Sequence, residues 1–131
     1  MAEIVTEEQI EQALRESGMT VSNDYFYEVS ASGFGMPLNL PRFRERIQKY
    51  EIDGETKVSY VCRTKKINKK KLTYVDSYTG CTQRVVRGED LISAIWMRCN
   101  KLIIIEMLRF VNDVDLYKEL FERLKEFKEC Q

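Results

Sequence analysis

The chain contains no histidine in 131 residues, and this absence excludes several functions. Histidine is the commonest general base near neutral pH and the commonest metal ligand in proteins. Without it, the chain cannot by itself form a Ser-His-Asp triad or a Cys-His pair for nucleophilic catalysis. Binding and assembly are the functions that remain, so we predict a protein that is not an enzyme and that holds neither a metal nor another cofactor.

Cysteine pairs of the metal-binding kind are also missing. The cysteines at positions 62, 81, 99 and 130 include no CxxC pair, so a zinc cluster is not expected. Cys62 and Cys99 lie in apolar patterns and are predicted to be buried, whereas Cys130 is predicted to be an exposed thiol. A disulfide between Cys62 and Cys81 would require neighbouring strands, and a reducing compartment argues against it.

Long apolar segments are absent as well. The most apolar run, Leu102 to Ile105, has four residues, whereas a membrane-spanning helix needs about 20. The acidic N-terminal segment lacks the basic and apolar regions of a signal peptide. We therefore expect a cytoplasmic protein with no membrane partner.

The charges are balanced in total but unevenly distributed. Lys and Arg number 21, as do Asp and Glu, and 44% of the residues are hydrophobic, which is typical of a folded protein. Residues 1–41 hold one base and seven acids (net −6), residues 42–87 thirteen and five (+8), and residues 88–131 seven and nine (−2). We interpret residues 1–131 as one domain whose basic middle block meets an acidic partner.

The N-terminal block predicts a helix, a strand and a loop. Thr6 and Gln9 have the spacing of a capping box, and Ser17-Gly18 is typical of a helix end. Residues 25–29 are rich in β-forming side chains, and residues 32–37 contain two glycines and a proline.

The middle block predicts an antiparallel β-meander of about four to five strands. Residues 47–52 and 57–63 would form a hairpin around Asp53-Gly54, which suits a tight type I′ turn. Residues 66–69 would form the next tip, followed by strands at 72–75 and 82–86 with a turn at 77–80. With helices on both sides, the fold class is α+β.

The C-terminal block, residues 88–131, predicts helices and an interface between two copies of the chain. Apolar side chains recur at alternating spacings of four and three, which indicates a heptad repeat. A single polar residue in this seam, Asn100, would fix its register. Either residues 89–128 form one helix, or Asn112 or Asp113 caps a second one; the poor helix formers there favour the break. The predicted dimer interface comprises Trp96, Ile103, Met107, Phe110, Tyr117, Phe121 and Leu124.

The basic block predicts a surface for nucleic acid. Lysine and arginine attract phosphates, and exposed tyrosines can stack on unpaired bases. Lysine at strand edges also prevents aggregation, however, and tyrosines in strands usually pack in cores. The predicted nucleic-acid-binding residues are Tyr60, Arg63, Lys65, Lys66, Lys69, Lys70, Lys71, Tyr74, Tyr78, Arg84 and Arg87. The expected ligand is single-stranded DNA or RNA, bound without sequence preference.

Three further patterns leave other functions open. A second basic run, from Arg42 to Lys49, would present its charges on one face only if it is extended. Glu55 and Lys57 have the E-x-K spacing of metal-dependent nucleases. A protein adaptor or inhibitor, such as a viral accessory protein, could use the acidic N-terminal helix or the loop carrying Phe34 and Met36 to bind a protein partner.

Overall fold

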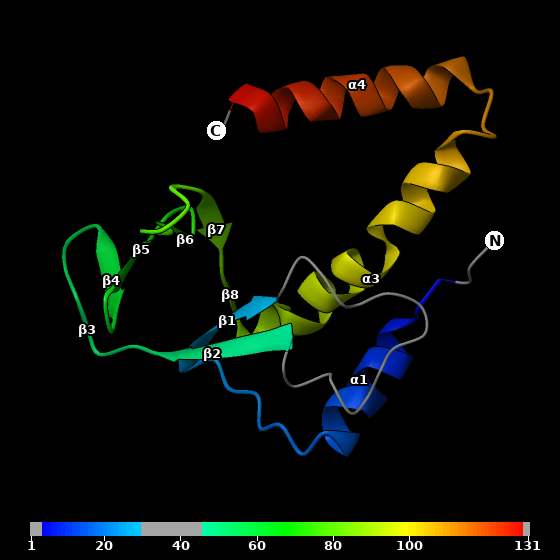
Figure 1. Cartoon of the computed structure of the whole chain (residues 1–131). Coiled ribbons are helices and arrows are strands. Elements are labelled where there is room, and N and C mark those ends of the chain that lie inside the picture. Colours follow the sequence, from blue (N-terminus) through cyan, green and yellow to red (C-terminus); the bar gives the residue numbers. More distant parts are fainter. Residues whose placement is uncertain (1–3, 30–45, 130–131) are drawn as a thin grey trace.

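The computed structural model describes residues 4–29 and 46–129 of the chain, with side chains up to residue 126. In this part, helices flank eight short strands that pair only in antiparallel fashion (Figure 1). The α+β class, the N-terminal helix and the C-terminal helical part are therefore confirmed. The strands form three small sheets instead of one meander, in the orders β2-β1-β8, β3-β4-β5 and β6-β7.

Helix α1 (Glu7–Glu16) begins at the predicted capping box. The Thr6 hydroxyl accepts the Gln9 backbone N–H at 3.2 Å, and the Gln9 side chain accepts the Thr6 N–H at 2.9 Å. The helix buries Ile10, Ala13 and Leu14 on one face. It ends before Gly18, whose φ of +71° is a left-handed conformation that glycine adopts without strain.

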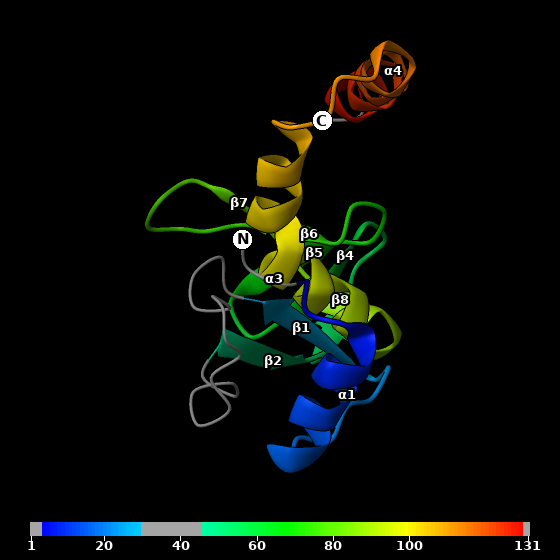
Figure 2. The same cartoon turned by 90° about the vertical axis from the view of Figure 1, so that its right-hand side faces the viewer.

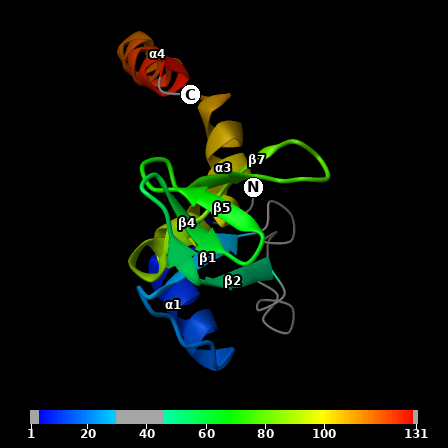
Figure 3. The ribbon, with the colours of Figure 1, turned by 90° about the vertical axis from the view of Figure 1, so that its left-hand side faces the viewer.

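Strand β1 (Tyr25–Val29) separates two hydrophobic cores. It pairs with β2 (Ile47–Glu51) on one side and with β8 (Val86–Arg87) on the other. Because side chains alternate along a strand, Tyr27 and Val29 pack with α1 and α3 in the first core, whereas Phe26 belongs to the second. The second core contains Phe26, Cys62, Ile67, Tyr74 and Val85 and lies under the remaining strands. Figure 3 shows β4 and β5 in front of the β1–β2 layer.

The predicted turn at Asp53-Gly54 is wrong. Gly54 instead pairs with Val61, joining β3 (Gly54–Glu55) to β4 (Ser59–Cys62). The chain reverses at residues 56–59, where the Thr56 N–H donates to the Ser59 carbonyl at 2.7 Å. Strand β2 pairs with β1 and not with β4, and this pairing buries Ile47 in the first core. Burial of an apolar side chain thus prevails over a locally favourable turn sequence.

The next turn also lies earlier than predicted. Residues placed at a tip by the sequence form strand β5 (Lys65–Asn68), and the turn between β4 and β5 consists of Arg63 and Thr64. Within β5, Ile67 is fully buried in the second core, so this segment cannot be an exposed tip.

Strands β6 (Thr73–Val75) and β7 (Thr82–Arg84) confirm the predicted last hairpin. Its turn is held by the Asp76 carboxylate, which accepts the backbone N–H groups of Tyr78 and Thr79. These hydrogen bonds hold the pKa of Asp76 below its usual value. Val85 then interrupts the pairing, because its side chain turns into the second core before β8 begins.

A 3₁₀ turn, η2 (Gly88–Asp90), leads into helix α3 (Leu91–Leu108). The chain passes close to the Ser22 backbone here: a Cβ atom at Gly88 would lie 2.6 Å from the Ser22 carbonyl oxygen. Leu91, Ile95 and Cys99 of α3 pack in the first core. Asn100 is fully buried and binds the backbone of Val5, accepting its N–H at 2.8 Å and donating to its carbonyl at 2.9 Å. Asn100 therefore joins two parts of the same chain and does not set the register of a coiled coil.

The C-terminal helical part is broken, as the sequence favours. Helix α4 (Val114–Glu129) begins after Asp113, whose carboxylate accepts the Leu116 N–H at 3.1 Å and caps the helix. The Tyr117 hydroxyl donates to the Leu108 carbonyl and connects α4 to the end of α3. Figures 1 and 2 show α4 turned back from α3 and standing apart from α1.

Candidate nucleic-acid interface

The basic residues of the middle block are positioned by two turns. At the first turn, Arg63 has a φ of +57°, and its N–H donates to the Asp53 carboxylate at 2.7 Å. At the second, the Asn68 side-chain oxygen accepts the N–H groups of both Lys70 and Lys71 at 2.9 Å. This Asx turn holds the backbone while both lysine side chains remain exposed.

Four cations meet in one groove of about 1230 Å³. Strands β5, β6 and β7 and the segments beside them form most of its wall, and the C-terminal part of α4 reaches it through Glu126. Glu126 is the one acid among the described lining residues, so the charge of the groove is positive. The lining residues are Ser59, Lys66, Asn68, Lys70, Lys71, Leu72, Thr73, Tyr74, Val75, Thr82, Arg84, Val85, Val86 and Glu126.

The other predicted cations have partners in the fold. Lys65, Lys69 and Arg87 are half-buried beside the aromatic rings of the second core. The Lys65 ammonium lies 5.1 Å from the centroid of the Tyr74 ring, and the Arg87 guanidinium lies 4.9 Å from that of Phe26. Each distance is within the range of a cation–π contact. Arg63 is exposed at its own turn and does not line the groove.

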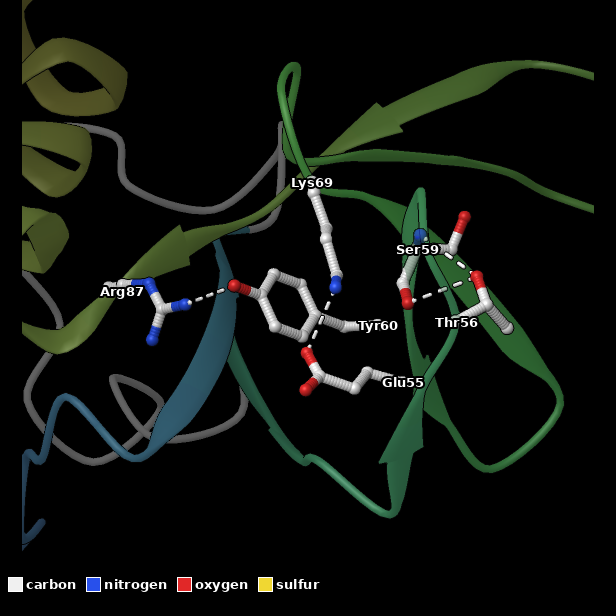
Figure 4. Close-up of polar contacts among 6 residues, drawn as sticks. All are labelled: Glu55, Thr56, Ser59, Tyr60, Lys69 and Arg87. Carbon is white, nitrogen blue, oxygen red and sulfur yellow. Dashed lines mark hydrogen bonds and ion pairs between the residues drawn. The ribbon is translucent and has the colours of Figure 1, made fainter.

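Figure 4 shows how Tyr60 is held between two of these cations. Its hydroxyl accepts a hydrogen bond from the Arg87 guanidinium at 3.1 Å, and the Lys69 ammonium lies 5.3 Å from its ring centroid. Lys69 also forms an ion pair of 3.0 Å with Glu55. The Tyr60 ring packs on Phe26 at a centroid distance of 5.3 Å. Tyr60 is therefore engaged within the fold and does not offer a free face for base stacking.

Tyr74 is buried as well, and its hydroxyl donates to the Glu28 carboxylate. The Tyr50 hydroxyl lies 3.1 Å from the same carboxylate oxygen. Burial, followed by the contact with Glu28, raises the pKa of the Tyr74 hydroxyl above its usual value. Burial is also the main cause of the raised pKa of Tyr50. This network connects β1, β2 and β6. Tyr74 therefore lines the groove but does not offer an open ring for base stacking.

Tyr78 differs from the other two predicted stacking residues. It lies in the turn between β6 and β7, two of the strands that line the groove, and it is 98% exposed, although it is not itself a lining residue. Of the three tyrosines, Tyr78 alone presents an open ring.

Several groove residues were not predicted from the sequence. Thr73, Val75 and Thr82 lie on the same face of the β6–β7 hairpin as the predicted Arg84, because alternate residues of a strand point the same way and Thr73 pairs with Arg84. This alternation along each strand is the sequence signal that could identify them. No signal in the sequence predicted Glu126, because only the direction of α4 brings it to the groove.

The carboxylates of the possible nuclease motif serve other contacts. Glu55 pairs with Lys69, and Asp53 accepts the Arg63 N–H. Among residues 4–29 and 46–129, no three His, Cys, Asp or Glu side chains are grouped so that they could hold a metal ion. The loop with Phe34 and Met36, the basic residues Arg42 and Arg44, and Cys130 lie outside the described residues.

The predicted dimer residues divide into two groups. Trp96 packs against the first core, and Ile103 is buried. The remaining five are exposed: Met107, Phe110, Tyr117, Phe121 and Leu124.

Comparison with known proteins found no relative of this chain. No family model, curated protein or solved structure matches this chain. The helices that the structure describes also include none with both the length and the hydropathy needed to cross a bilayer. The geometry of the groove is therefore the observation that bears on function.

Proposed function

We propose that this chain binds single-stranded nucleic acid, DNA or RNA, in the groove between β5, β6 and β7, and that it does so without catalysing a reaction. The observation that carries this proposal is the convergence of Lys66, Lys70, Lys71 and Arg84 on one groove. Cations that line one groove attract a polyanion, and the polyanion releases its counterions on binding.

The chemistry of the groove favours backbone contacts over base recognition. Three of its four cations are lysines, which bind phosphates as mobile point charges. Thr73, Val75 and Val86 add a lining of small side chains that carry little hydrogen-bonding information. Such contacts depend weakly on sequence.

Tyr78 favours single strands as the ligand. Its exposed ring at the end of the β6–β7 hairpin can stack on an unpaired base, whereas the bases of a duplex are stacked on one another. We place this activity in the cytoplasm, which agrees with the free thiols of Cys62, Cys81 and Cys99.

The first test measures fluorescence anisotropy of a labelled single-stranded oligonucleotide, titrated with the full chain at several salt concentrations. Four phosphate contacts give a slope of about −3 for the logarithm of the association constant against the logarithm of salt concentration. Affinity should then fall about 50-fold between 50 and 200 mM salt. No binding at 50 mM salt would contradict the proposal.

A charge-matched pair of variants locates the contact. The groove variant replaces Lys66, Lys70, Lys71 and Arg84 with glutamine. The control variant removes the same number of charges from exposed positions outside the groove: Arg15, Lys57, Lys101 and Arg109. The groove variant should lose most of the affinity and of the salt slope, while the control should keep both. Equal losses would mean that only net charge matters.

Two single substitutions refine the assignment. Tyr78→Ala should weaken binding to the single strand by about 5- to 160-fold, which corresponds to one stacked base, and should leave duplex binding unchanged. Glu126→Gln removes the acid from the groove and should strengthen binding. Unchanged affinity in both variants would mean that neither α4 nor the β6–β7 turn contacts the ligand.

A further inference from the structure

An apolar stripe is exposed along α4 and the link before it. Val114, Tyr117, Phe121 and Leu124 are separated by three, four and three residues, so they lie on one side of α4, and Phe110 precedes them in the link. The stripe consists of Phe110, Val114, Tyr117, Phe121 and Leu124, which are 76%, 66%, 44%, 60% and 63% exposed. We call these five residues the α4 stripe.

Helix α4 receives little support from its own chain. Its start is fixed by the Asp113 cap and by the bond from Tyr117 to Leu108, and Glu126 lines the groove near its other end. Between these points the views of Figures 1 and 2 show it clear of the body. An isolated helix of 16 residues is marginally stable in water, so burial of its apolar face would stabilise it.

The exposed area is sufficient for a specific interface. A buried aromatic side chain removes about 200 Å² from water, so Phe110, Tyr117 and Phe121 alone present roughly 350 Å². With Val114 and Leu124 the α4 stripe reaches roughly 500 Å². Two stripes facing each other would bury about 1000 Å², which is the lower bound for a specific protein–protein interface.

We propose that the α4 stripe binds the same stripe of a second copy of this chain, with the two helices parallel and in register. The heptad spacing is self-complementary, and a twofold axis between the helices places each stripe residue near its own counterpart. The proposal does not depend on the groove or its ligand.

The charges beside the stripe determine the orientation. In a parallel pair, Asp113 of one copy lies beside Lys118 of the other, five positions further along, and Leu120 lies beside Lys125 in the same way. The first contact is an ion pair that the twofold axis repeats, and the second covers a leucine with the methylene groups of a lysine. An antiparallel pair would instead bring the lysines of the two copies together. The parallel arrangement therefore has the better charge complementarity.

Sedimentation equilibrium of the full chain tests the dimer with a matched pair of variants. Val114 is 66% exposed on the stripe, and Val58 is 63% exposed at the β3–β4 turn. The unaltered chain should sediment as a dimer, Val114→Glu should weaken the association at least tenfold, and Val58→Glu should leave it unchanged. A monomer at every concentration would overturn the proposal, and the stripe would then be a surface for a different protein.

A cysteine crosslink tests the orientation. Leu124→Cys is made in a chain whose Cys81 and Cys130 are replaced with serine, since Cys81 is exposed and Cys130 would otherwise compete. Parallel helices in register bring the two introduced thiols together, so mild oxidation should give a covalent dimer. A Ser93→Cys control, on an exposed part of α3 away from the stripe, should stay monomeric on a denaturing gel. A dimer that Val114→Glu disrupts but Leu124→Cys does not crosslink would overturn the parallel arrangement.

Discussion

Replacement of Asn100 by leucine is the sharpest test of how this fold is held together. Leucine has the same branched shape as asparagine and is somewhat larger, so the change removes two hydrogen bonds without opening a cavity. Those bonds satisfy the N–H and the carbonyl of Val5, in a part of the chain where Val5 is 4% exposed. Both backbone groups would be left buried without a partner.

The expected cost follows from these two groups. A buried polar group without a hydrogen bond costs about 1–3 kcal/mol, so Asn100→Leu should lower the free energy of unfolding by roughly 2–5 kcal/mol. For a chain of this length each kcal/mol lowers Tm by about 3–5 °C. The Tm should therefore fall by roughly 6–25 °C.

Urea denaturation at two protein concentrations measures this effect. Asn112→Leu is the control, because Asn112 is exposed in the link between α3 and α4, and it should change the free energy of unfolding by less than about 0.5 kcal/mol. If Asn100 instead lay in a coiled-coil seam between two chains, it would lower the stability of the dimer, and leucine at position 100 would be stabilising. A stabilised Asn100→Leu variant would refute the intramolecular role of this residue.

Three other predictions concern the cores. Gly88→Ala should lower the free energy of unfolding, measured in urea, by about 1–3 kcal/mol, because the new Cβ would meet the Ser22 backbone. Gly54→Ala is the control and should cost far less, because a Cβ there faces open space. Equal effects would contradict the close approach of Gly88 to Ser22. Because the pKa of Tyr74 is raised, the folded state keeps the proton of its hydroxyl above pH 10, the usual tyrosine pKa. This group should therefore not affect stability below pH 10, and stability should fall as the pH rises above 10. That loss should be smaller in Tyr74→Phe, when unfolding is measured from pH 9 to 11. Burial raises the pKa of Cys99 to about 11, so at pH 8 an aromatic disulfide reagent should modify exposed Cys81 within minutes and Cys99 only after denaturant is added. Rapid reaction of Cys99 in a chain with serine at positions 81 and 130 would contradict this and would show that α3 opens.

Part of the candidate site could be predicted from residue types alone. The sequence located the basic block, and four of its eight predicted cations line the groove. It did not separate them from Lys65, Lys69 and Arg87, because lysine and arginine serve equally as phosphate ligands and as neighbours of buried rings. That choice depends on which face of β4, β5 and β8 is covered by the second core.

The local elements were determined by the sequence itself. The capping box of α1, the hairpin around Asp76, and the break before α4 each depend on side chains that bond to backbone groups two or three residues away. Such interactions need no distant partner, so their patterns predict them correctly. The tertiary structure decided which strands pair, what Asn100 binds, and where α4 points. From the sequence alone, Ile47 could pack in either hydrophobic core. The pairing of β2 with β1 places it in the first core. These outcomes depend on contacts between residues far apart in the chain, for which local propensity gives no preference.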